Sequence, residues 1–167
     1  MKDVNIIFIG ENFEYTKAVA EDLSARLDMY FLNSIELIKF DISPANMDEY
    51  FKGRPKGYFE ESLFKSLKYM STFENTAIVV PFGMALVPNG MQVLDERGLV
   101  VHIKQKQQKA VADTKTEKGL LVPGLLSRGK AAKVAKEYAD IVIDANNMGE
   151  IKCTSEILKQ ILAYYNV

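Results

Sequence analysis

The chain has 167 residues, of which 48% are hydrophobic and 26% are charged, so it suits one folded domain and is too apolar for a disordered chain. Its 21 basic and 22 acidic side chains leave a formal net charge of -1, which argues against a nucleic-acid partner or an acidic membrane surface. With one cysteine, Cys153, and one histidine, His102, a single chain cannot build a disulfide framework or a Cys/His zinc site.

Short apolar runs rich in β-branched residues recur along the chain. The first, at residues 6–9, is too short and too close to acidic residues for a signal peptide, and none approaches about 18 residues, so we expect a cytoplasmic protein without a membrane span. The runs predict buried strands at 6–9, 30–32, 78–80, 99–103 and 141–143.

Segments with helical spacing of apolar residues lie between these runs. Val19, Leu23 and Leu27 mark the first, and residues 157–165 contain the last. The alternation predicts an α/β fold, a three-layer sandwich with a five-stranded parallel sheet between helices. We expect a single domain over residues 1–167, with a flap at about 104–130 in place of a further strand or regular helix.

The first strand-to-helix connection, residues 10–17, reads GENFEYTK. Ligands of open parallel sheets bind beyond the carboxyl ends of the strands, where a P-loop has the pattern G-x-x-x-x-G-K-[ST]. Gly10 fits this pattern, but Tyr15, Thr16 and Lys17 stand where the second glycine, the lysine and the hydroxyl residue belong. Glu11 and Glu14 also place negative charge where a triphosphate needs positive surroundings. An ordinary grip on ATP is therefore not expected.

The framework segments are NIIFIG, SARLDMYFLNSIELI, ENTAIVVPFGMALVPNGMQVLDERGLVVHI and EYADIVID. In this order they resemble the shikimate kinase family over nearly the whole chain. The resemblance implies a P-loop kinase fold. For an active member it also implies transfer of the terminal phosphate of ATP to a hydroxyl of shikimate, in aromatic amino acid biosynthesis, with ATP and magnesium as cofactors.

Carried over by the same resemblance, the acidic Asp-x-Asp motif after the second strand falls on residues 33–35. Its magnesium-side aspartate becomes Asn33, and its presumed catalytic aspartate becomes Ile35, which cannot accept a proton. The remaining candidates are Lys17, Asn33 and Glu36 for catalysis, and Thr16 and Asn33 for the metal if the chain is active.

The substrate and nucleotide positions of the family also change. The arginine that would clamp a carboxylate becomes Glu60, and the triple-glycine turn after the third strand becomes Pro81, Phe82 and Gly83. The last family arginine falls on Ala131, near Lys130. The remaining candidates are Gly10, Thr16, Lys17, Lys118 and Arg128 for the nucleotide, and Asn33, Gly83 and Lys118 for the substrate.

These departures coincide on the nucleotide loop, the metal site, the base and the substrate clamp, while the framework remains. The sequence therefore favours a shikimate-kinase-like pseudoenzyme retained for binding a small molecule or a protein partner. A divergent active shikimate kinase is the alternative. His102 and Cys153 are interpreted as structural residues.

A regulatory or interaction subunit is the second alternative. It would use aromatic and methionine side chains as interface anchors, namely Tyr58, Phe59, Tyr69, Met70, Phe73, Tyr164 and Tyr165. The same spacing is also typical of residues that face the core of their own domain.

Overall fold

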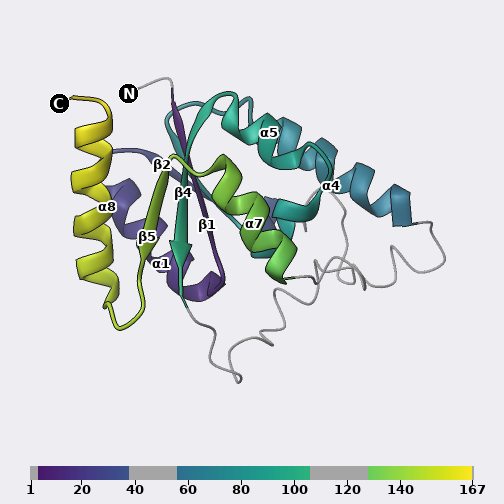
Figure 1. Cartoon of the computed structure of the whole chain (residues 1–167). Helices are drawn as coiled ribbons and strands as arrows, with labels where there is room; N and C mark the ends of the chain where they lie inside the picture. Colours follow the sequence, from purple (N-terminus) through teal and green to yellow (C-terminus); the bar gives the residue numbers. More distant parts are fainter. Residues whose placement is uncertain (1–3, 38–55, 106–127, 167) are drawn as a thin grey trace.

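A computed structural model of the chain describes residues 4–37, 56–105 and 128–166 (Figure 1). In chain order, the strands are β1 (Asn5–Gly10), β2 (Tyr30–Asn33), β3 (Thr76–Val80), β4 (Gly98–Lys104) and β5 (Ile141–Asp144). The helices are α1 (Phe13–Arg26), α4 (Lys56–Met70), the 3-10 helix η1 (Phe82–Leu86), α5 (Gly90–Asp95), α7 (Arg128–Tyr138) and α8 (Glu150–Tyr164). Residues 34–37 are also helical.

The five strands form one sheet in the order β2-β3-β1-β4-β5, and every neighbouring pair is parallel. In the centre, Ile7 of β1 lies opposite Ile78 of β3 and Val100 of β4. The predicted α/β class and the five parallel strands are confirmed. Since the strands are parallel, the connections that follow them all leave from one edge of the sheet, which we call the carboxyl edge.

Helices cover both faces of this sheet (Figure 1). Helices α1 and α8 pack against each other on one face, whereas α4, α5, α7 and η1 are in contact on the other. This double cover explains why all residues of β1 and β3 are buried and read as unbroken apolar runs. The edge strand β5 alternates instead, with Ile141 and Ile143 buried and Val142 and Asp144 exposed.

Helix α1 begins at Phe13, which corrects the expected eight-residue loop over residues 10–17. The Asn12 side chain caps the helix by accepting a hydrogen bond of 3.2 Å from the Tyr15 amide. Only Glu11 and Asn12 separate β1 from α1. A Cβ atom at Gly10 would lie 2.7 Å from the Ile103 carbonyl oxygen and would also collide with the Thr16 hydroxyl. Gly10 therefore permits close packing of α1 on the sheet.

The expected flap overlaps two regular elements at its ends. Lys104 is the last residue of β4, and residues 128–130 belong to α7. Residues 106–127, which include the predicted site residue Lys118, lie outside the described part of the chain. Among the described residues, no helix combines the length and the apolar character needed to cross a membrane.

Candidate functional site

The carboxyl edge holds a pair formed by the half-buried Glu11, directly after β1, and the buried His102 within β4. The Glu11 Oε1 atom lies 3.3 Å from His102 Nε2, and its Oε2 atom accepts a hydrogen bond of 2.6 Å from the Gln105 amide. His102 is only 1% exposed. The carboxylate of Glu11 is therefore held against the ends of two neighbouring central strands.

The environment of Glu11 favours its ionised form. Burial raises the pKa of this carboxyl group, but the hydrogen bonds from His102 and the Gln105 amide outweigh burial and lower the pKa overall. Glu11 thus supplies a fixed negative charge at the edge where a P-loop would hold a phosphate.

Phe82 covers the other side of His102. Their rings stack with centroids 6.0 Å apart and planes inclined by 26°. Phe82 is 5% exposed, and His102 Nδ1 is buried without a hydrogen-bond partner in the described residues. Hence the imidazole donates from Nε2 to Glu11 and packs on Phe82, as expected of a structural histidine.

Tyr15 and Thr16 are also occupied by internal hydrogen bonds. The Tyr15 hydroxyl donates to the Met148 carbonyl over 2.8 Å and thereby joins α1 to the connection between β5 and α8. Burial and the contact with the Cys153 thiol raise the pKa of Tyr15, so the hydroxyl remains a donor. The Thr16 hydroxyl is 1% exposed and donates to the Asn12 carbonyl over 2.8 Å.

The residues after β2 form a helix start. Asn33 Oδ1 accepts a hydrogen bond of 3.0 Å from the Ile35 amide. Ile35 is fully buried and belongs to the core, whereas Glu36 is exposed. Of the candidates for catalysis and metal binding, Asn33 is half-buried at this edge, and Glu36 points to the surface. Among the described residues, no group of three or more His, Cys, Asp or Glu side chains could hold a metal ion.

The turn after β3 is a 3-10 helix capped by Pro81. The Met84 amide donates to the Pro81 carbonyl over 3.0 Å, and Gly83 is half-buried between the two buried residues Phe82 and Met84. Nearby, between α4 and the turn before α5, a pocket of about 220 Å³ is lined by Glu60, Glu61, Phe64, Pro88 and Asn89. Its two acidic side chains have the charge opposite to the one that would bind a carboxylated substrate.

The cationic candidates are spread over different elements. Lys17 lies in the second turn of α1, half-buried and without an ion pair to any described residue. Arg128 begins α7, and Lys130 is exposed on that helix. Ala131, on which the last family arginine falls, is 2% exposed and faces the core, so it offers no cation to a nucleotide.

The aromatic residues proposed as interface anchors divide between core and surface. Met70 is fully buried, while Tyr69 is 53% exposed with its ring edge-on to Phe73. Tyr164 is 54% exposed on α8. Cys153, by contrast, is fully buried, in agreement with a structural role.

Two features of this edge were not predicted from the sequence. The first is the Glu11–His102 pair, whose members are 91 residues apart but become neighbours through the β1–β4 register, in which Ile9 lies opposite His102. The second is the tie between Tyr15 and Met148. The predicted strand pairing could have found the first, whereas no sequence signal pointed to the second.

Comparison with solved structures finds shikimate kinases. The enzyme from Acinetobacter baumannii, solved in complex with shikimate, matches with a TM-score of 0.74 and 19% identity, over 96% of this chain and 94% of that one. The enzyme from Aquifex aeolicus matches with a TM-score of 0.68 and 22% identity, over 98% and 96% of the two chains. No protein-family model matches this chain, and no curated protein matches it. The chain therefore has a shikimate-kinase-like P-loop kinase fold.

Proposed function

We propose that this chain is a shikimate-kinase-like protein that does not carry out ordinary ATP-dependent phosphoryl transfer and whose fold is retained for binding a small molecule or a protein partner. One observation carries the proposal. Helix α1 begins at Phe13, and the carboxylate of Glu11 receives the Gln105 amide at the edge where the phosphates of ATP would need free amides and positive charge.

The short connection supports this proposal on steric grounds. A P-loop surrounds phosphate with successive backbone amides that point inward. Here Glu11 and Asn12 alone lie between β1 and α1, and Asn12 uses its side chain to cap the helix. The Thr16 hydroxyl, the candidate metal ligand, donates to the Asn12 carbonyl instead. Each of these groups would have to exchange an internal hydrogen bond for a contact with nucleotide.

The loss of the base supports the proposal on chemical grounds. Ile35 is buried in the core, so even a change of side chain at this position would not place a base at the surface without moving the backbone. The pocket beside Glu60 and Glu61 offers carboxylates where the family's arginine would clamp a carboxylated substrate.

A divergent active shikimate kinase is the second candidate, and the match of the fold over almost the full length of known shikimate kinases favours it. Phosphoryl transfer depends mainly on positioning and charge neutralisation, which Lys17 and cations of the 104–130 region would have to supply.

An assay of ADP release with Mg-ATP and shikimate separates the two candidates. We expect no release above the rate without enzyme. Release that depends on shikimate, and that is lost in Lys17→Ala but kept in the control Lys159→Ala, which changes an exposed lysine of α8, would establish the active kinase instead. The Lys17→Ala variant should fold, because Lys17 makes no ion pair with a described residue.

A further inference from the structure

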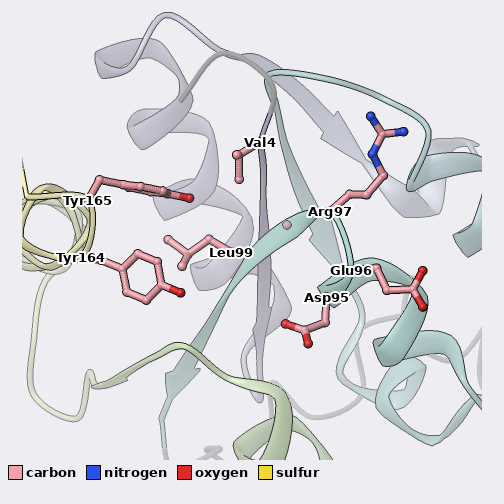
Figure 2. A pocket seen from close by; sticks show the side chains of 8 residues that line it. Val4, Asp95, Glu96, Arg97, Leu99, Tyr164 and Tyr165 are labelled. Atoms are coloured by element: carbon pink, nitrogen blue, oxygen red, sulfur yellow. The ribbon is translucent and has the colours of Figure 1, made fainter.

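A second pocket lies at the opposite, amino edge of the sheet, where β1 and β4 begin. It has a volume of about 370 Å³, within the size range of sites for small ligands, and is lined by Val4, Asp95, Glu96, Arg97, Gly98, Leu99, Tyr164 and Tyr165. Figure 2 shows that these residues come from the chain just before β1, the end of α5, the start of β4 and the end of α8. The pocket is separate from the carboxyl edge described above.

One side of this pocket is aromatic and apolar. The rings of Tyr164 and Tyr165 meet edge to face, with centroids 5.2 Å apart. Val4 and the buried Leu99 lie between these rings and the acidic side of the pocket (Figure 2). Tyrosine rings present a negative face to a cation and an apolar surface to a hydrocarbon.

The other side is acidic. Figure 2 shows the Asp95 carboxylate turned toward the tyrosines, whereas the Glu96 side chain and the Arg97 guanidinium extend away from them. Arg97 instead reaches Glu74, 3.5 Å away. Asp95 has no hydrogen bond or ion pair with another described residue, so its half-buried carboxylate faces the pocket without a counter-charge from that part of the chain.

The electrostatics of the pocket agree with this geometry. Burial, the nearby Asp140 and the adjacent Glu96 raise the pKa of Asp95. Burial, Tyr164 and Asp140 also raise the pKa of Tyr165. Asp140 is fixed in place because its carboxylate accepts a hydrogen bond of 2.9 Å from the Val100 amide. The pocket therefore disfavours added negative charge, and a cation would relieve the repulsion among its carboxylates.

We propose that this amino-edge pocket binds a small organic ammonium ion, a primary amine with a short apolar or aromatic body. The ammonium group sits between the Asp95 carboxylate and the ring of Tyr164, and the body packs on Leu99 and Tyr165. An anionic ligand is disfavoured because the single guanidinium among the lining residues extends away from the tyrosines. The site is independent of nucleotide binding at the carboxyl edge.

A titration of the ¹⁵N-labelled full chain, followed by NMR, tests this site with three probes of similar size. They are 2-phenylethylamine, the neutral 2-phenylethanol and the anionic 3-phenylpropanoate. We expect the amine to shift the amides of residues 95–99 and 164–165 with a Kd of about 1 mM, and the alcohol to bind about tenfold more weakly or not at all. The anion should leave these amides unchanged.

Two matched variants complete the test. Asp95→Asn should weaken amine binding to the level of the alcohol, whereas Glu21→Gln, which is exposed on α1 and does not line the pocket, should bind the amine like the parent. Thermal unfolding should give Asp95→Asn a midpoint at or above that of the parent, so weaker binding would not reflect unfolding. Equal binding of amine and alcohol, unchanged binding by Asp95→Asn, or no shift with the amine would each overturn the proposal.

Discussion

The two edges of the sheet differ in how their polar groups are used. At the carboxyl edge, Glu11 pairs with His102 and the Gln105 amide, and Tyr15 binds the Met148 carbonyl. At the amino edge, Asp95 faces a pocket without a partner in the described chain. At the edge that binds ligands in most open parallel sheets, these polar groups thus hydrogen-bond to other residues of the chain. At the opposite edge, the Asp95 carboxylate has no such partner among the described residues. A fold alone therefore does not locate the binding site.

The largest effect is expected from Gly10→Ala, which probes close packing at the carboxyl edge. The new Cβ would meet the Ile103 carbonyl oxygen at 2.7 Å, so we expect the free energy of unfolding to fall by about 1–3 kcal/mol. Urea unfolding measures this change. Gly149→Ala is the comparison, since nothing lies within 4 Å of its Cβ position; because Gly149 is the N-cap of α8, its substitution should cost up to about 1 kcal/mol. Equal effects of the two substitutions would contradict the packing role of Gly10.

The Glu11–His102 pair predicts a specific dependence of stability on pH. Because the pKa of Glu11 is lowered on folding from an ordinary value of 4.5, its contribution is present above that value and is lost as the pH falls through the folded pKa. We expect Glu11→Gln to cost about 1–2 kcal/mol at neutral pH. The cost should shrink in acid, which urea unfolding across about pH 2.5–7 would measure.

Glu14→Gln serves as the control for this prediction. Glu14 is exposed in the first turn of α1, three residues after Glu11, and makes no hydrogen bond to a described residue. Its substitution should leave the acid limb of the stability curve unchanged. A Glu11→Gln variant that loses the same stability at every pH would show that the charge of Glu11 is not what the fold uses.

A smaller loss is expected for Tyr15→Phe, which removes the hydroxyl that binds Met148. The cost should be about 0.5–1.5 kcal/mol, the usual contribution of one such hydrogen bond. Tyr69→Phe removes a hydroxyl from a side chain that is 53% exposed and provides the control. If the two substitutions change the thermal midpoint equally, the tie between α1 and the β5–α8 connection does not stabilise the fold.

The smallest effect, and one of opposite sign, is expected at the amino edge. The pKa of Asp95 is raised on folding, so its stabilising contribution is present in acid and is lost as the pH rises through the folded pKa. At neutral pH the charge opposes folding, and Asp95→Asn should raise the free energy of unfolding by about 0.5 kcal/mol. That gain should vanish below the unfolded pKa. A loss of stability at neutral pH would mean that Asp95 has a partner that stabilises the fold.

Sequence reasoning predicted the framework well because buried parallel strands leave a strong apolar signal. The runs at 6–9 and 99–103 fall inside β1 and β4, and each observed strand extends the predicted run by no more than two residues at either end. The start of α1 was missed although Asn12 is a common helix-capping residue, because the P-loop pattern required a longer loop at that place.

The sites were harder to predict than the fold because their members are distant in sequence. Glu11 meets His102 only through strand pairing, and Asp95 and Tyr164 line one pocket only because α8 ends beside the start of β4. Spacing along the chain contains no direct record of such contacts. Ile35 was different, since a change from aspartate to isoleucine can be read at a single position once the resemblance is known.

Calorimetric titration of the purified chain with ATP, with and without magnesium, tests most directly whether the carboxyl edge is closed by its own residues. We expect no saturable heat up to about 1 mM nucleotide, a limit that corresponds to about -4 kcal/mol of binding free energy. Saturable binding that requires magnesium would contradict the account, because Glu11 and the first turn of α1 would then have to release their internal hydrogen bonds for phosphate.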